Sequence, residues 1–209
     1  MVLELATPHG PARAHLHKAP RPRAALVLGH GAGGGVGAPD LVAATTVALD
    51  QGFSVALVEQ PYRVAGRRSP APAPQLDAAW LAALAQLRAG SLRRLELIAG
   101  GRSSGARVAC RTAADAGVAA VLCLAFPLHP PGRGNDPAKS RLPELDAVRV
   151  PTLVVQGERD PFGIPPPKRG RRKVVVVPGD HALRNAAAVR DAVAAWLPAL
   201  KLGSASASR

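Results

Sequence analysis

The sequence contains few aromatic residues and only two cysteines, and it has no long hydrophobic run. Aromatic residues make up 3% of its 209 residues, although hydrophobic residues make up 47%. The longest apolar runs, such as residues 118–126 and 174–177, are much shorter than the ~20 residues that a membrane-spanning helix needs. The apolar fraction excludes a wholly disordered chain. The composition therefore favours a globular protein of about one domain, with no segment inserted in a membrane.

The cysteines and the N-terminus give no sign of a metal site or of secretion. Cys110 and Cys123 form no metal-ligand or redox pattern, and we expect neither a metal nor a cofactor. The first residues lack the basic segment and the apolar segment of a secretory signal. We therefore expect a reducing, cytoplasmic setting.

The charge is one-sided, with 27 Lys and Arg against 14 Asp and Glu, which gives a net charge of +13. Such an excess first suggests a nucleic-acid or membrane-surface partner. However, 22 of the basic residues are Arg, and Ala, Gly and Pro number 42, 21 and 21. All four types have GC-rich codons, so we favour genome composition over a nucleic-acid partner. The densest basic run, residues 168–173, is expected to be a solvated loop.

Short apolar runs alternate with Gly- or Pro-rich turns and with Ala-rich amphipathic stretches. We expect strands over residues 23–28, 53–58, 95–99, 118–124, 152–156 and 173–177, and helices over residues 39–51, 75–89, 104–116 and 186–197. This alternation implies parallel pairing through right-handed crossovers. The strands are continuously apolar, as expected for a sheet that is covered by helices on both faces.

The predicted fold is α/β, with a doubly wound, mostly parallel sheet in a single domain over residues 1–202. Residues 2–5 and 13–17 are expected to form a hairpin that extends the sheet antiparallel. Residues 127–151 are too few for a separate lid and are expected to hold at most a turn of helix. The small, polar residues 203–209 are expected to be a disordered tail.

One segment between a predicted strand and a predicted helix has the pattern Gly-x-Ser-x-Gly. It reads Gly101-Arg102-Ser103-Ser104-Gly105. In a nucleophile elbow the serine lies on a strained turn, and only very small residues fit two positions before and after it. Both positions are glycine around Ser103, whereas around Ser104 they are Arg102 and Ala106. We therefore predict that Ser103 is a nucleophile; a plain Gly-rich turn is the alternative.

A serine hydroxyl needs a base within hydrogen-bond reach, and elbow enzymes carry serine, acid and histidine in that order. His181 follows the last predicted strand and fits the order. His129 precedes the candidate acids and breaks it, although it could line the pocket. Asp160 is the predicted acid that orients the imidazole, with Glu158 as the alternative. The simpler interpretations are a loop histidine that caps the final helix and a turn aspartate before proline.

Acyl transfer also needs N–H donors for the oxyanion of the intermediate. We predict the Ser104 N–H, at a helix start, and the Ala32 N–H, with Gly33 as the alternative to Ala32. Residues 29–34 also match the bare Gly-x-Gly-x-x-Gly pattern of a dinucleotide-binding turn, and Glu59 ends the next strand. Dinucleotide binding stays open as an alternative, but it leaves the elbow and its two partners unexplained.

With these residues in place, the chain resembles the α/β-hydrolase superfamily in its small, cap-less, dienelactone-hydrolase-like form. More narrowly, it is similar to the bacterial branch related to testis-expressed and chromatin-complex-subunit hydrolase-like domains. The matching segments are residues 30–34, 61–63, 100–105, 126–132, 156–163 and 179–181. The resemblance spans residues 23–197 and implies an eight-strand-type sheet, here slightly reduced, with a Ser103–Asp160–His181 triad. It implies no particular substrate.

Two departures from the family pattern bear on the substrate. Ile164-Pro165-Pro166-Pro167 replaces the helix expected after the acid loop, because proline is excluded from a helix interior. Residues 127–151 are also too few to cover a long acyl chain. Both features favour small or exposed esters over lipids.

We therefore predict a serine hydrolase of carboxylic esters or related small acyl compounds. Candidate pocket residues are His30, Gly33, Tyr62, Arg63, Arg102, His129 and Phe162. For Arg102, beside the nucleophile, a solvated side chain is favoured over contact with an acidic substrate. The alternative function is a non-catalytic scaffold of the same fold that binds a protein or a nucleic acid through its Arg-rich surface, in a salt-sensitive manner. The sequence does not indicate an oligomeric state.

Overall fold

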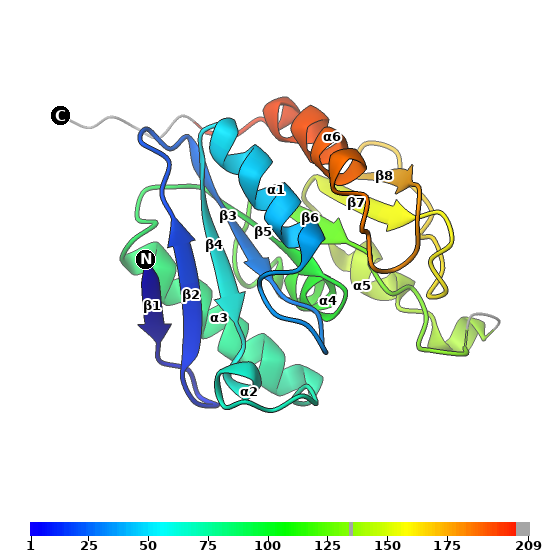
Figure 1. The fold of residues 1–209 in the computed structure, drawn as a ribbon, viewed down its shortest axis with the longest axis horizontal. Coiled ribbons are helices and arrows are strands. Elements are labelled where there is room, and N and C mark those ends of the chain that lie inside the picture. The colour runs from blue at the N-terminus through cyan, green and yellow to red at the C-terminus, as the bar shows by residue number, and fades with distance from the viewer. Residues whose placement is uncertain (134–135, 204–209) are drawn as a thin grey trace.

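The computed structural model describes residues 1–133 and 136–203, and its centre is a sheet of eight strands (Figure 1). The strands are β1 (Val2–Leu5), β2 (Ala12–His17), β3 (Ala24–Gly29), β4 (Phe53–Glu59), β5 (Leu97–Arg102), β6 (Ala120–Leu124), β7 (Thr152–Gly157) and β8 (Arg172–Val177). Their order across the sheet is β1-β2-β4-β3-β5-β6-β7-β8. Strand β2 is antiparallel to β1 and to β4, and the other neighbours are parallel. The predicted hairpin is confirmed, and the expectation of a reduced sheet is wrong.

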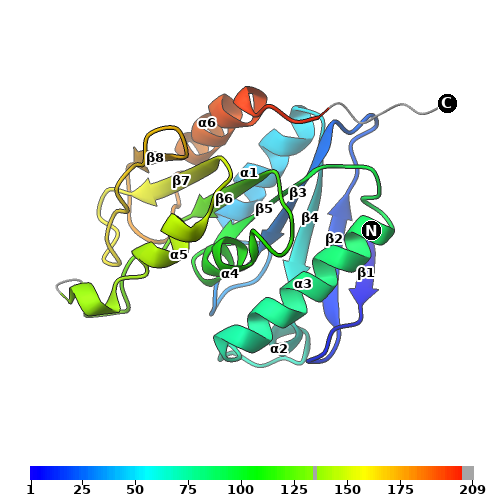
Figure 2. The same ribbon diagram turned by 180° about the vertical axis from the view of Figure 1, so that it is seen from behind.

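Helices cover both faces of the sheet. They are α1 (Pro39–Asp50), α2 (Pro61–Val64), α3 (Ala73–Ala89), α4 (Ser104–Thr112), α5 (Leu142–Ala147) and α6 (Ala186–Trp196), with 3-10 turns at Pro137–Lys139 and Leu197–Ala199. Helices α1 and α6 pack side by side on one face (Figure 1), and α3, α4 and α5 lie on the other (Figure 2). This is the predicted doubly wound α/β fold. Within residues 1–133 and 136–203, no helix has both the length and the apolar character to cross a membrane.

The core forms two layers, one on each face of the sheet. Trp80 of α3 packs in one layer, and Leu41 of α1 and Trp196 of α6 pack in the other. Every residue of β3, β6 and β7 is buried. Because helices cover both faces of these strands, both sets of alternating side chains must be apolar. The continuous apolar runs in the sequence are explained by this arrangement.

Strand β5 extends further than predicted, and this extension positions the site. It continues to Arg102, whereas the prediction ended at Ala99. Glycine is disfavoured in strands, so the prediction stopped before Gly100 and Gly101. In the structure both glycines pair with β3 on one side and with β6 on the other. The strand therefore carries the backbone directly to Ser103.

Three helical segments differ from their predictions. Helix α4 ends at Thr112 instead of residue 116. Helix α2 was not predicted; like α5, it has proline in its first turn, where the missing N–H costs no hydrogen bond. Helix α5 has six residues, more than the single turn that we expected in this connection. No helix occurs in residues 158–171, in agreement with the effect expected of the prolines.

The C-terminal end of the described chain lies near the start of β5. The N–H of Gly203 donates to a carboxylate oxygen of Glu96 over 2.7 Å. Residues 204–209, which make up the rest of the predicted disordered tail, lie outside the described residues.

Candidate active site

Ser103 lies on the sharp turn between β5 and α4. Its backbone has φ 52° and ψ −109°, a conformation that is rare and strained for a residue with a side chain. A Cβ on Gly101 would lie 2.5 Å from the carbonyl oxygen of Gly29, and a Cβ on Gly105 would collide with the same oxygen. Both glycines are therefore required by the close approach of β3. The predicted elbow geometry is present at Ser103.

The structure brings together the side chains of the three residues predicted to form a triad. His181 Nε2 lies 2.9 Å from Ser103 Oγ, and His181 Nδ1 lies 2.8 Å from Asp160 Oδ2. We assign the imidazole proton to Nδ1, since the carboxylate can only accept a hydrogen bond. Nε2 is then free to accept the proton of the serine hydroxyl. This is the arrangement that activates a serine for nucleophilic attack.

Asp160 is buried and held by further donors. Its Oδ1 accepts from the Phe162 N–H over 2.9 Å, and its Oδ2 accepts from the Gln156 side-chain amide over 2.7 Å. The same amide also lies 3.0 Å from the carbonyl oxygen of Gly163. The alternative acid, Glu158, is exposed and pairs with the neighbouring Arg159. Gln156 carries no signal in the sequence, because a glutamine within an apolar strand belongs to no catalytic motif.

The acid loop also packs against the imidazole of His181. The Phe162 ring packs edge-to-face on the His181 imidazole, with their centroids 4.4 Å apart. The carbonyl oxygen of Phe162 accepts from the His129 N–H over 2.9 Å. Arg141 in turn donates to the carbonyl oxygen of His129 over 3.2 Å. Phe162 thus restrains the imidazole, and His129 joins the β6–α5 connection to the acid loop.

His30 and Tyr62 brace the loop after β3. His30 is buried; its Nδ1 lies 2.8 Å from the carbonyl oxygen of Gly31, and its Nε2 accepts from the Gln60 N–H over 3.1 Å. Burial lowers the pKa of His30, which favours the neutral ring that these two bonds require. The Tyr62 hydroxyl donates to the carbonyl oxygen of Ala32 over 2.9 Å. These contacts fix the backbone beside the elbow, a role that the sequence did not reveal for His30.

The remaining predicted residues lie around this loop. Ser104 begins α4, so its N–H is at a helix start. Gly33 faces open space, since a Cβ built on it meets no atom within 4 Å. Arg63 donates to the carbonyl oxygen of Arg67 over 3.4 Å, within the exposed turn after α2. The contacts therefore associate Arg63 with that turn.

Glu59, the acid of the dinucleotide alternative, has a partner within the sheet. Its Oε2 lies 2.9 Å from His15 Nε2 across the β2–β4 pair. This pairing accounts for Glu59 without a bound ribose.

Arg102 meets Asp40, which the sequence analysis did not identify. Arg102 Nε lies 2.9 Å from Asp40 Oδ2, and Arg102 Nη2 donates to the carbonyl oxygen of His181 over 3.0 Å. Asp40 is fully buried in the first turn of α1, and burial raises its pKa to about 6 against the opposing charge of Arg102. In the sequence, Asp40 resembles an ordinary acidic residue at a helix start.

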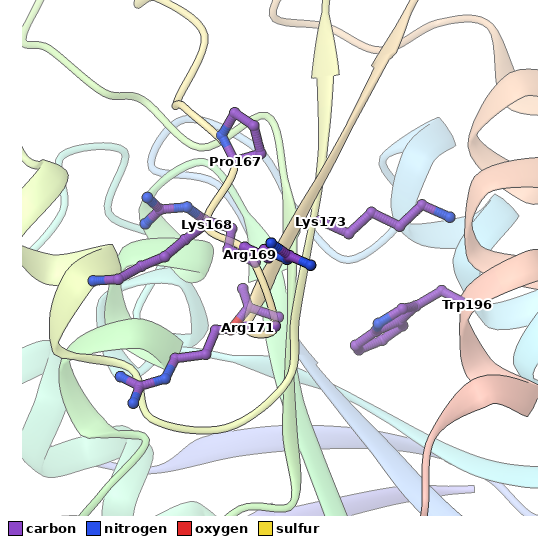
Figure 3. Close-up of a pocket in the computed structure, with 9 residues that line it drawn as sticks. Pro167, Lys168, Arg169, Arg171, Lys173 and Trp196 are labelled. Carbon is purple, nitrogen blue, oxygen red and sulfur yellow. The ribbon is translucent and has the colours of Figure 1, made fainter.

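The dense basic run lies at the amino end of β8, whereas His181 follows the carboxyl end of that strand. It borders an open pocket of about 300 Å³ that Trp196 also lines. In the close-up, Lys168 and Arg171 extend to one side of β8 and Lys173 to the other (Figure 3). Lys168 and Arg172 both contact a carboxylate oxygen of Asp146, over 3.3 and 3.2 Å. Arg172 is buried at the start of β8, so the expectation that the whole run is a solvated loop is wrong at this residue. Across the described ranges, no group of three or more His, Cys, Asp and Glu side chains could hold a metal ion.

Comparison with known proteins identifies a family. A family model described as "Alpha/beta hydrolase domain" matches residues 22–185. No curated protein matches the chain significantly. The narrower resemblance to testis-expressed and chromatin-complex-subunit domains stays a prediction.

Several solved structures share the fold. An alpha-beta serine hydrolase homologue from Coxiella burnetii has 14% identity and a TM-score of 0.77, covering 94% of this chain and 97% of that one. XC6422 from Xanthomonas campestris, described as an a/b serine hydrolase without lid, has 21% identity and a TM-score of 0.69, covering 95% of both chains. A dienelactone hydrolase from Anabaena variabilis has 16% identity and a TM-score of 0.74, covering 96% of this chain and 97% of that one. At these identities the likeness shows the fold.

The packing of the His181 loop on Gly157 gives a first prediction. A Cβ on Gly157 would collide with the carbonyl oxygen of Asp180 and lie 2.8 Å from that of Gly179. Gly157→Ala should displace the loop and slow fluorophosphonate labelling at least ~10-fold, because small misplacements of reacting groups are costly. Gly37→Ala is the control, since a Cβ there meets no atom within 4 Å. Equal labelling of both variants would contradict the prediction.

The buried carboxyl of Asp40 gives a second prediction. Its pKa is about 6 in the folded state against an ordinary 3.8. Between these values the folded state binds more protons than the unfolded state, so stability should fall as pH rises. The free energy of unfolding of wild type, relative to Asp40→Asn, should drop by on the order of 1–3 kcal/mol from pH 4 to pH 6.5. Urea denaturation measures this difference, and a difference that does not change with pH would contradict the shift.

Proposed function

The chain belongs to the alpha/beta hydrolase family, and on this premise we propose that it is a serine hydrolase of carboxylic esters or related small acyl compounds. The observation that carries the proposal is the continuous pair of contacts of 2.9 and 2.8 Å from Ser103 through His181 to Asp160. The strained backbone at Ser103 supports it, because strain of this kind persists where function requires it. A scaffold protein has no need of this arrangement.

In the proposed reaction, Ser103 Oγ attacks the acyl carbon while its proton passes to His181 Nε2. The tetrahedral oxyanion accepts hydrogen bonds from the backbone N–H groups of Ala32 and Ser104. His181 then protonates the leaving alcohol, and a covalent acyl-enzyme remains. Water then attacks the acyl carbon while His181 Nε2 takes its proton. The bond from the acyl carbon to Ser103 Oγ breaks, the carboxylic acid leaves, and His181 returns the proton to Ser103 Oγ. Asp160 stays ionised throughout and stabilises the imidazolium.

We propose a small or exposed acyl group because little of the chain is available to cover the site. Between β6 and β7, in the residues that the structure describes, the regular elements are a 3-10 turn and the six-residue α5. No helix follows the acid loop in residues 158–171. Phe162 is a candidate wall for the acyl group, beside the imidazole that it contacts.

We also infer that residues 1–202 form one domain in a reducing, cytoplasmic setting. A single sheet takes strands from Val2 to Val177, and α6 packs on α1. The two cysteines are buried free thiols with their sulfur atoms 3.5 Å apart.

The triad is tested by fluorophosphonate labelling and by turnover of p-nitrophenyl acetate. Wild type should be labelled at Ser103, and Ser103→Ala and His181→Gln should lower kcat at least ~10³-fold. Asp160→Asn should lower kcat by ~10²–10⁴-fold, because the imidazole loses its orientation. Ser91→Ala, in the loop before β5, is the matched control. Equal turnover by wild type and Ser103→Ala would contradict the proposed reaction and leave the shared fold as the remaining likeness to these enzymes.

The proposed acyl size is tested separately with p-nitrophenyl esters of increasing chain length. Because little of the chain covers the site, acetate and butyrate should have kcat/KM at least ~10-fold above palmitate, since each uncovered methylene gains little from burial. A kcat/KM that rises steadily to palmitate would contradict this assignment. The labelling result above would be unaffected.

A further inference from the structure

We infer that Arg102, held by buried Asp40, is a positioning residue that fixes the loop carrying His181. The inference rests on the proposed function, since it concerns the same nucleophilic site. It assigns Arg102 a role different from contact with an acidic substrate and from simple exposure to solvent.

First, Arg102 contacts the loop that carries His181, residues 178–185, which we call the histidine loop. Arg102 is the last residue of β5 and directly precedes Ser103. Its Nη2 donates to the carbonyl oxygen of His181 over 3.0 Å. The residue before the nucleophile therefore holds the backbone of the residue whose ring meets the nucleophile. Ser103 and His181 are therefore connected twice, by the contact between their side chains and through Arg102.

The second step is the anchor of the guanidinium. Asp40 has no exposed surface, and its Oδ2 lies 2.9 Å from Arg102 Nε. Neither atom has a well-aligned hydrogen-bond partner, so the link between them is an ion pair. Oδ1 accepts from the Leu41 N–H over 2.9 Å, which fixes the carboxylate on α1. An ionised carboxylate at this depth is costly unless a cation is beside it, so Asp40 and Arg102 hold each other in place.

The third step is the contact between Arg102 and the loop after β3. A Cβ on Gly31 would lie 3.0 Å from Arg102 Nη1 and 3.6 Å from Ser103 Cβ. The guanidinium therefore lies directly against the backbone that leads to the proposed oxyanion donor Ala32. Its side chain is 18% exposed, which leaves little of it for a ligand. The guanidinium of Arg102 thus lies against α1, the loop after β3 and the histidine loop.

The histidine loop needs such a restraint because residues 178–185 form neither helix nor strand. Gly179 and Leu183 have φ values of 121° and 47°. The planar fork of N–H groups on arginine holds an acid and a carbonyl at a fixed spacing, whereas the three donors of lysine share one nitrogen on a flexible stem.

The experiment compares Arg102→Gln with Arg111→Gln. Arg111, on α4, donates to both carboxylate oxygens of Asp77 over 2.8 and 2.6 Å and is 20% exposed. Both variants remove a paired guanidinium, but only the first releases the His181 loop. Arg102→Gln should lower kcat and the fluorophosphonate labelling rate ~10–100-fold with KM within about threefold. Arg111→Gln should stay within about twofold of wild type in all three quantities.

A rescue experiment distinguishes a positioning role of Arg102 from a role in folding alone. Millimolar guanidinium chloride should raise the labelling rate of Arg102→Ala at least about fivefold, whereas sodium chloride at equal ionic strength should not raise it. Asp40→Asn, which keeps the arginine but removes its anchor, should show a smaller loss of kcat of the same kind. If Arg102→Gln does not fold, Arg102→Ala and Asp40→Asn carry the test.

The outcomes distinguish this inference from the proposed function. If wild type is labelled at Ser103 and the Arg102 variants lose melting temperature but keep the wild-type labelling rate, Arg102 is structural and the inference is overturned. Absence of rescue by guanidinium with an intact fold also overturns it. If wild type itself is not labelled, the proposed function fails, and the positioning role fails with it.

Discussion

The site depends on the contact between bare backbone at the ends of β3 and β5. The carbonyl oxygen of Gly29 lies where side chains at Gly101 or Gly105 would have to be. This closeness lets the chain turn sharply enough to place Ser103 in a left-handed conformation above the sheet. The same kind of contact recurs at Gly157, where the histidine loop packs against β7. Absence of side chains at these glycines therefore lets the backbone segments that carry Ser103 and His181 approach closely.

Polar groups around this backbone form two separate supports. On one side, Gln156 and the Phe162 N–H hold Asp160, and Asp160 holds the imidazole. On the other side, Asp40 holds Arg102, and Arg102 holds the carbonyl oxygen of His181. The ring and the backbone of one histidine are thus fixed by two separate contacts. Contacts of this kind hold a side chain in one geometry before a ligand binds.

The sequence was sufficient for the fold and for the three side chains that the structure brings together at the proposed triad, because both leave short-range signals. Parallel strands covered on both faces give unbroken apolar runs, and the elbow requires its glycines at fixed spacing. Gln156, Asp40 and the bracing role of His30 left no such signal. Each acts through a partner distant in the chain, such as Asp40 with Arg102, so only the folded structure reveals them. The end of β5 was misjudged for a related reason, since pairing on both sides outweighs the low strand propensity of glycine.

The placement of the basic run has a consequence for how the molecule behaves at high concentration. Strand β8 is the last in the sheet, with no further strand beside it among the described residues, and Val176 on it is 49% exposed. The bridge between Lys168 and Arg172 covers the start of this edge, and the rest of an exposed edge can template the addition of another chain and begin aggregation. Arg171 and Lys173 are exposed beside this edge and would bring like charges together if two such edges met. The positive charge that first suggested a partner thus disfavours self-association at this edge.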